Sequence, residues 1–266
     1  FFFFFGFDIY DRGLGSILSD KINTKRYNIN DDEVTFENAW GIADDDIYRK
    51  VLNVADEKAK SKQPFFAFVM STSNHKPYTY EDGKIDIPSG SGRPGAIKYA
   101  DYAIGDFLAQ AKKKPWFDNT VFVFIADHCA SSAGKDAIDV KNHHIPAFIY
   151  NLKSHQNINV SKEVAQIDIF PTLFSLLNWK YISQFYGKDI FDPLYQSRSF
   201  MGTYIKLGMK KGNDVMILSD QKKINQYKWL NQNLEESKID SKFEHSIISN
   251  YQTADYLFSN KLLNEK

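Results

Sequence analysis

Uncharged apolar runs recur along this chain, and polar residues follow each of them. The longest run covers residues 120–126 and contains neither a charged residue nor a glycine. A second run covers residues 64–70, and a third covers residues 145–150 with a proline near its beginning. Runs of this length predict strands buried on both faces, as in a parallel sheet, and a proline is tolerated at the first positions of a strand.

Between these runs, apolar residues recur at spacings of three and four, which predicts amphipathic helices. One helix is predicted from Pro94 to about residue 111, with Pro115 stopping it. Its predicted apolar face consists of Ile97, Ala100, Ile104, Phe107, Leu108 and Ala111. Another helix is predicted to follow residue 164 and to carry Pro171 in its first turn. Strands that alternate with helices predict an α/β fold with a mostly parallel sheet flanked by helices.

A further helix is predicted to start at the acidic triplet Asp44, Asp45 and Asp46 and to run to about residue 60. The triplet has two interpretations, a metal cluster or a set of N-caps and first-turn acids. Three consecutive side chains on a helix point in different directions, so they cannot all face one site. We therefore interpret the triplet as capping charges.

The last part of the chain has a different pattern. Residues 199–206 and 215–218 predict an antiparallel hairpin, residues 224–230 a third strand, and residues 235–266 a terminal helix. We expect two parts, residues 1–195 as an α/β part and residues 196–266 as antiparallel strands plus a terminal helix packed on it.

Composition narrows the classes of function. Lys and Arg together number 33, as do Asp and Glu, so no global field favours nucleic acid. The one cysteine, Cys129, excludes an intramolecular disulfide and a zinc site built from cysteines. The apolar runs are too short to span a bilayer, and the phenylalanines at residues 1–5 lack the basic flank of a signal peptide. We expect further chain before residue 1.

Candidate chemistry lies where the apolar runs end. Asp127 and His128 directly follow the run at residues 120–126, and His75 follows the run at residues 64–70. In open α/β sheets, ligands bind at the carboxyl ends of strands. A carboxylate beside an imidazole suits Zn²⁺ or Mn²⁺, whereas an Asp-His pair taken alone is more often a polar strand end whose Asp caps a loop. Two strands that both end at histidines favour a shared crevice.

A family resemblance follows from the order of several sequence blocks. They are Trp40-Gly-Ile-Ala-Asp-Asp, Pro64-Phe-Phe-Ala-Phe-Val with Ser73-Asn-His-Lys-Pro-Tyr, Phe122-Val-Phe-Ile-Ala-Asp-His, His144-Ile-Pro, Gln166-Ile-Asp-Ile-Phe-Pro-Thr-Leu and Gly187-Lys-Asp-Ile-Phe. In this order the chain resembles the sulfatase-like branch of the alkaline phosphatase superfamily, especially lipoteichoic acid synthases and related phosphoglycerol transferases. The resemblance runs from about Gly6 to about Tyr227 and implies the α/β fold of that superfamily.

The resemblance also implies roles for individual residues. Asp127 and His128 match the family's metal-binding pair, for which Mn²⁺ is the first expectation and Mg²⁺ or Zn²⁺ are alternatives. His75 matches the histidine that contacts the phosphoglycerol headgroup. His144 matches a histidine beside the site, and His143 is an alternative to it.

The remaining parts of the implied site are not in this sequence. The early acidic ligand and the nucleophilic Thr of the family lie in a preceding half, so the catalytic residue is unknown here and the chain alone is expected to be nearly inactive. We interpret Gln166 and Asp168, which belong to another block, as structural.

For the intact protein, the resemblance implies a metal-dependent phosphoglycerol transferase that acts on a cell-envelope lipid or glycan. It would be anchored in a bacterial inner or cell membrane by helices preceding this chain, with the catalytic domain in the periplasm or outside the cell. The substrate would be a phosphoglycerol-bearing lipid or glycan, and no nucleic acid would be bound. A sulfatase or phosphodiesterase on the same fold, or a non-catalytic binding domain, are the alternatives.

Overall fold

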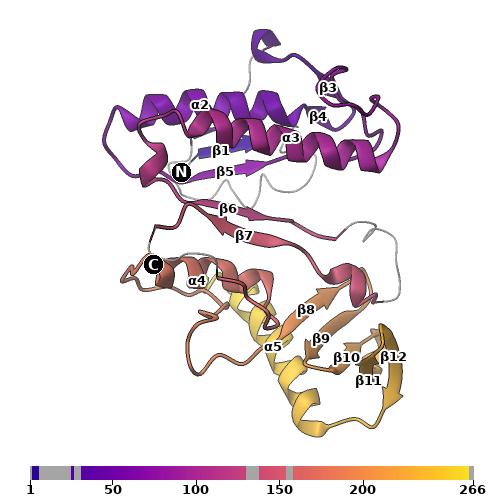
Figure 1. The fold of residues 1–266 in the computed structure, drawn as a ribbon. Coiled ribbons are helices and arrows are strands. Elements are labelled where there is room, and N and C mark those ends of the chain that lie inside the picture. Colours follow the sequence, from indigo (N-terminus) through magenta and orange to yellow (C-terminus); the bar gives the residue numbers. More distant parts are fainter. Residues whose placement is uncertain (1, 6–24, 27–30, 130–137, 154–157, 264–266) are drawn as a thin grey trace. The chain divides into compact units, whose positions relative to one another are not determined.

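The computed structural model of this chain describes residues 2–5, 25–26, 31–129, 138–153 and 158–263 (Figure 1). The chain divides into two compact units, residues 1–120 and 121–266. Each unit has its own sheets and helices.

The first unit contains a three-stranded parallel sheet in the order β2-β1-β5. Its central strand is β1 (Phe2–Phe5), which pairs with β2 (Lys25–Arg26) and with β5 (Ala67–Met70). The phenylalanine run is therefore a strand, in keeping with the high β-propensity of aromatic residues. The strand predicted at residues 64–70 is present but begins at Ala67.

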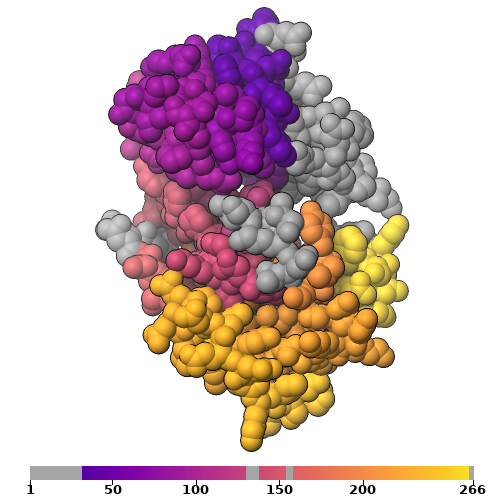
Figure 2. Space-filling view, turned by 90° about the vertical axis from the view of Figure 1, so that its right-hand side faces the viewer, coloured from indigo at the N-terminus to yellow at the C-terminus, as the bar shows by residue number. Residues whose placement is uncertain are grey.

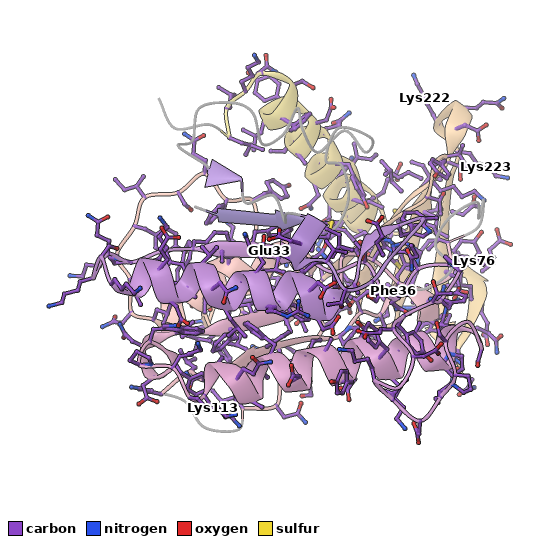
Figure 3. The ribbon with its side chains drawn as sticks, turned by 90° about the horizontal axis from the view of Figure 1, so that it is seen from above. Glu33, Phe36, Lys76, Lys113, Lys222 and Lys223 are labelled. Carbon is purple, nitrogen blue, oxygen red and sulfur yellow. The ribbon has the colours of Figure 1, made fainter. Side chains whose placement is uncertain are left out.

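Two long helices, α2 (Asp44–Ala59) and α3 (Arg93–Ala111), pack side by side in this unit (Figure 3). α3 has Pro94 in its first turn, as predicted. Its buried face differs from the predicted one: Ile97 is exposed, and the buried residues include Ala96, Tyr99, Ala103, Phe107 and Ala111. The printed contacts with α2 come from the two aromatic residues of this face: the Tyr99 hydroxyl donates to Asp45 at 2.6 Å, and the Phe107 ring lies 5.2 Å from the Tyr48 ring.

A short hairpin precedes α2 and is made of β3 (Glu37–Asn38) and β4 (Gly41–Ile42). The 3₁₀ helix η2 (Asp31–Glu33) lies before it, and η3 (Phe117–Asn119) follows α3. In Figure 3, the segment that carries Glu33 and Phe36 lies beside α2. A buried cluster of Ala43, Tyr80 and Tyr99 packs against Phe36 and Ile85. It joins the hairpin, the loop between β5 and α3, and α3 itself.

The acidic triplet at the start of α2 does not cap the helix in the predicted way. Ala43 is the N-cap residue and makes no side-chain capping bond. Asp44, Asp45 and Asp46 are first-turn acids, as predicted, but all three are buried. Each accepts hydrogen bonds from a different segment, because consecutive helical side chains diverge. The triplet thus ties three segments to one helix end. The prediction of N-caps is wrong, and the prediction of first-turn acids is confirmed.

The second unit begins with β6 (Phe122–Ile125), which pairs antiparallel with β7 (Ala147–Tyr150). The run at residues 120–126 was expected to be buried on both faces. Instead β6 is half-buried, and Ile125 is 38% exposed. Within the residues described for this unit, β6 pairs with β7 alone, so it is an edge strand of a two-stranded sheet rather than a central strand. The helices that follow are η4 (Lys141–His143), η5 (Gln166–Asp168) and α4 (Ile169–Leu176), which carries Pro171 as predicted.

A five-stranded antiparallel sheet, in the order β12-β11-β10-β9-β8, completes the second unit. The strands are β8 (Ser199–Gly202), β9 (Leu207–Lys211), β10 (Asp214–Leu218), β11 (Ile224–Leu230) and β12 (Asn233–Ser237), with η6 (Asp220–Lys222) between β10 and β11. Their surface is coloured from orange to golden yellow along the sequence in the space-filling view (Figure 2). The terminal helix α5 (Ser241–Ser259) buries Phe243 and Ile247 against Met209 and Met216. The helix predicted at residues 235–266 is therefore shorter, because residues 233–237 form an edge strand.

The predicted fold class, a parallel sheet flanked by helices with an antiparallel C-terminal subdomain, is confirmed, with the antiparallel β6–β7 pair as a local difference. The division at residue 195 stays a prediction. None of the helices in the described ranges is both long enough and apolar enough to cross a membrane.

Candidate functional site

Asp127 and His128 lie just beyond the end of β6. The backbone N–H of Ala126 donates to the carbonyl of Pro146 at 3.2 Å, which ties this end to the approach to β7. Both side chains are largely exposed, 61% for Asp127 and 55% for His128. Asp127 Oδ1 accepts from the backbone N–H of His128 at 2.8 Å, and Asp127 Oδ2 lies 3.4 Å from His128 Nε2. The pair is therefore accessible and already oriented.

The contacts of the His128 ring favour one tautomer. Nδ1 lies 2.8 Å from the carbonyl oxygen of Cys129. A carbonyl only accepts, so the neutral ring carries its hydrogen on Nδ1 and leaves Nε2 as the basic nitrogen. Metal-ligating histidines characteristically donate their other ring N–H to a carbonyl or carboxylate. His128 thus has the arrangement of a histidine that ligates through Nε2.

Gln166 supports the same strand end from η5. Its side-chain amide donates to the carbonyl of Ala126 at 2.8 Å and to that of Asp127 at 3.1 Å. These bonds hold the backbone that carries the candidate pair. Gln166 is therefore a structural residue in a specific sense: its side chain holds the backbone at Asp127 in position.

The two consecutive histidines in this unit have different surroundings. His143 Nδ1 lies 2.7 Å from the carbonyl of Asp139, and its Nε2 lies 3.4 Å from the carbonyl of Gly202 in β8. Its ring therefore links η4 to the antiparallel sheet. His144 is exposed at the C-cap of η4. The geometry favours His144 over His143 as the residue open to a ligand.

In the first unit, a network of hydrogen bonds shapes the loop that carries His75. Asp44 Oδ1 accepts from the backbone N–H groups of Thr72 at 2.7 Å and Ser73 at 3.0 Å, and Ser73 Oγ accepts from the N–H of Asp44 at 3.0 Å. The N–H of His75 then donates to the carbonyl of Thr72 at 3.2 Å. The neighbouring Lys76 marks this loop in Figure 3. The start of α2 therefore determines the course of the loop.

Asp44 is an unusual carboxylate in this network. Burial raises its pKa, and the hydrogen bonds from Thr72 and Ser73 act in the opposite direction without cancelling the rise. Its second oxygen, Oδ2, has no hydrogen-bond partner among the described residues. Loss of solvation is the larger effect because a buried carboxylate with one unpaired oxygen is poorly stabilised.

The residues described do not form a complete metal site. Asp127 and His128 provide two donors of the types that Zn²⁺ and Mn²⁺ accept, and the geometry of His128 fits a ligand. Within the described ranges, however, no group of three or more His, Cys, Asp or Glu side chains is placed to hold a metal. Four-coordinate Zn²⁺ and six-coordinate Mn²⁺ both need further ligands.

The predicted site residues fall in both units. Asp127, His128 and His144 belong to the second unit, and His75 belongs to the first. Asp127 and His128 contact each other, whereas the shared crevice with His75 stays a prediction.

Two further residues, Trp40 and Arg198, contact residues named above and were not singled out from the sequence. Trp40 stacks on the ring of His75, and Arg198 pairs with the buried Asp168. Trp40 lies in one of the sequence blocks that carry the family resemblance, so a signal was present. Arg198 lies 30 residues from its partner and has no local signature.

Comparisons with known proteins agree with these features. A family model described as sulfatase matches residues 4–179. Lipoteichoic acid synthase of Staphylococcus saprophyticus is 28% identical over 170 residues, which are 57% of this chain and 25% of that protein. Phosphoglycerol transferase I of Citrobacter koseri is 29% identical over 106 residues, which are 36% of this chain and 13% of that protein. The chain thus spans about a quarter or less of the length of these relatives.

Solved structures give the same result for the fold. A protein of the alkaline phosphatase superfamily from Vibrio parahaemolyticus matches all of this chain and 66% of its own, with a TM-score of 0.87 and 28% identity. A lipoteichoic acid synthase from Listeria monocytogenes matches 97% of this chain and 69% of its own, with a TM-score of 0.66; at 19% identity this similarity concerns the fold alone. The resemblance drawn from the sequence blocks is confirmed. With more than half of its residues matched by the family model, the chain belongs to the sulfatase family.

Proposed function

We propose that this chain is part of the catalytic domain of a metal-dependent phosphoglycerol transferase of the lipoteichoic acid synthase type. The observation that carries the proposal is the exposed Asp127–His128 pair at the end of β6, with His128 Nδ1 directed at the Cys129 carbonyl and His128 Nε2 on the side of the Asp127 carboxylate, 3.4 Å from its Oδ2. The named relatives include lipoteichoic acid synthases and phosphoglycerol transferases, which supports phosphoryl transfer as the chemistry.

In this proposal, Asp127 and His128 hold one side of a divalent cation, Mn²⁺ first and Mg²⁺ or Zn²⁺ as alternatives. When bound, such a cation supplies charge stabilisation and lowers the pKa of a coordinated nucleophile. The other ligands and the nucleophilic Thr would belong to a longer protein. In keeping with this, the match covers 25% of the length of the Staphylococcus saprophyticus relative. Gln166 would keep Asp127 in position through its two backbone hydrogen bonds.

His75 and His144 would act on the substrate. An imidazole N–H donates a hydrogen bond to an anionic phosphate oxygen, and a protonated ring also offsets its charge. His75 is half-buried on a loop with a hydrogen-bonded backbone, and His144 is exposed. The substrate would be a phosphoglycerol-bearing lipid or glycan. The intact protein would be anchored in a bacterial membrane, with this domain outside the cytoplasm.

The test uses the full-length protein in vesicles that contain phosphatidylglycerol, with Mn²⁺ added. We expect transfer of phosphoglycerol to a glycolipid acceptor, and loss of both bound Mn²⁺ and turnover in Asp127→Ala and His128→Ala. The loss should exceed the roughly 10- to 100-fold that removal of an outer-shell partner costs. The matched control is His245→Ala, because His245 is an exposed histidine on α5.

Each alternative has its own outcome in this assay. Release of glycerol phosphate into water without transfer would replace the transferase with a hydrolase. If the wild type showed neither bound metal nor turnover, a non-catalytic domain would be favoured. Equal metal content in the wild type and His128→Ala would contradict the assignment of His128.

A further inference from the structure

The indole of Trp40 lies against the imidazole of His75 in a stacked arrangement. Their ring centroids are 4.0 Å apart, and the ring planes differ by 18°. Trp40 comes from the turn between β3 and β4, and His75 comes from the loop after β5. Both side chains are half-buried, so the pair lies at the surface of the first unit rather than in its core.

Hydrogen bonds fix both sides of this stack. The backbone N–H of Trp40 donates to Asn38 Oδ1 at 2.8 Å, and the Asn38 amide donates to the carbonyl and hydroxyl oxygens of Thr79 at 3.3 and 3.2 Å. Asn38 therefore ties the Trp40 turn to the far end of the His75 loop. Asp44 ties the near end of the same loop to α2. The two rings are thus presented by segments that are bonded to each other.

A second stack in the same unit, between Tyr80 and Tyr99, serves as a comparison because it lies in the core. Tyr80 and Tyr99 have centroids 4.8 Å apart and planes 7° apart. Both rings are fully buried and belong to a core cluster. Trp40 and His75, in contrast, are both only half-buried. The tyrosine stack is therefore part of the core, whereas the Trp40–His75 stack is partly open to solvent.

We propose that Trp40 is a positioning residue that holds His75 for recognition of a phosphate monoester or diester headgroup. The indole face fixes the plane of the imidazole before the ligand arrives, which lowers the cost of ordering this ring on binding. The same face stabilises the protonated ring through a cation–π interaction. This inference rests on the proposed function, because it assigns the His75 side of that site to a phosphate-bearing group.

The test follows His75 directly, by NMR of the full-length protein labelled at histidine. The chain contains six histidines, and His75→Gln identifies the signal of interest by its disappearance. Stacking on an indole shifts imidazole protons by ring current. We expect Trp40→Leu to move the His75 signals toward unstacked positions, and Trp40→Phe to retain most of the original shift. Trp179→Leu, at an exposed tryptophan of the second unit, is the matched control and should leave them unchanged.

Binding is then measured by titrating sn-glycerol 3-phosphate and following the same His75 signals. We expect Trp40→Leu to weaken binding by roughly three- to tenfold, and Trp40→Phe to restore most of it. Equal affinity of the wild type and Trp40→Leu, or unchanged His75 signals in Trp40→Leu, would overturn the positioning role and leave the proposed function standing. A wild-type His75 signal that does not respond to glycerol phosphate would instead remove His75 from the proposed site, and the inference with it.

Discussion

Two aspartates of the second unit, Asp168 and Asp127, have the same side chain but differ in burial and in hydrogen-bond partners. The side chain of Asp168 is 0% exposed, and its oxygens accept from Arg198 Nη1 at 2.5 Å, Arg198 Nη2 at 2.9 Å and Tyr195 Oη at 2.9 Å. The backbone N–H groups of Ala165 and Lys188 complete the set. Asp127 is largely exposed and contacts its neighbour His128.

The difference separates a residue of the scaffold from a candidate ligand. A buried carboxylate with several donors and a guanidinium has little capacity left for a ligand, and it holds together the segments that supply those donors. Asp168 thereby joins η5, the loop at Gly187 and Lys188, and the approach to β8. An exposed carboxylate beside an oriented imidazole contributes little to folding and is open to a cation. The same contrast predicts opposite results for stability and activity.

The largest effect is expected for Asp168→Ala. Removal of the carboxylate leaves the guanidinium of Arg198 buried without its partner, which should destabilise the second unit by about 3–5 kcal/mol. Urea unfolding followed by circular dichroism measures this. A loss below about 1 kcal/mol would show that Asp168 and Arg198 are not the scaffold described here.

The next effect concerns Gly187, which lies against the backbone of η5. A Cβ at this position would lie 1.9 Å from the carbonyl oxygen of Ile167, so backbone must move. We expect Gly187→Ala to cost roughly 2–3 kcal/mol, measured by thermal unfolding. Gly105→Ala in α3 is the control, because nothing lies within 4 Å of its Cβ and alanine favours the helix by up to ~1 kcal/mol. Equal melting temperatures for the two variants would contradict this close approach.

A smaller effect is expected from acid. Burial by itself would raise the pKa of Asp168, but the hydrogen bonds from Arg198, Lys188 and Ala165 outweigh it, and the pKa lies below its usual value. The folded carboxylate therefore binds protons less readily than the unfolded one, whose pKa is about 3.9. Its stabilisation is present above that pH and is lost as the pH falls through the folded pKa. Urea midpoints between about pH 3 and 6 should fall more steeply toward acid in the wild type than in Asp168→Asn.

The smallest effect on folding is expected for Asp127→Ala. Exposed substitutions away from buried networks usually change stability by less than about 0.5 kcal/mol. The same urea experiment measures it, and the vesicle assay measures the accompanying loss of transfer. A large loss of stability would place Asp127 with Asp168 in the scaffold and weaken its assignment as a ligand.

Local signals in the sequence were sufficient for much of the fold and for the candidate pair. The three- and four-residue spacing over residues 94–111 predicted α3, because that spacing places apolar residues on one helix face. The apolar run before Asp127 predicted a strand that ends at a carboxylate and an imidazole. The ordered blocks were sufficient to identify the family, since they recur in its members in that order.

Other features depend on residues that are distant in the chain. Asp168 and Arg198 are 30 positions apart, Gln166 reaches the Asp127 carbonyl across 39, and Asp44 reaches Thr72 across 28. No periodicity records such pairs, because they form when separate segments pack and exclude water from polar groups that must then find partners. From the sequence, the acidic triplet was interpreted as helix caps, because the distant donors that bond to it leave no local pattern. In the structure its members are buried and accept hydrogen bonds from separate segments. The sequence by itself determined the helices, the family and the candidate donors Asp127 and His128. Packing decided which carboxylates are buried in the scaffold and which stay exposed, and it placed Trp40 on His75.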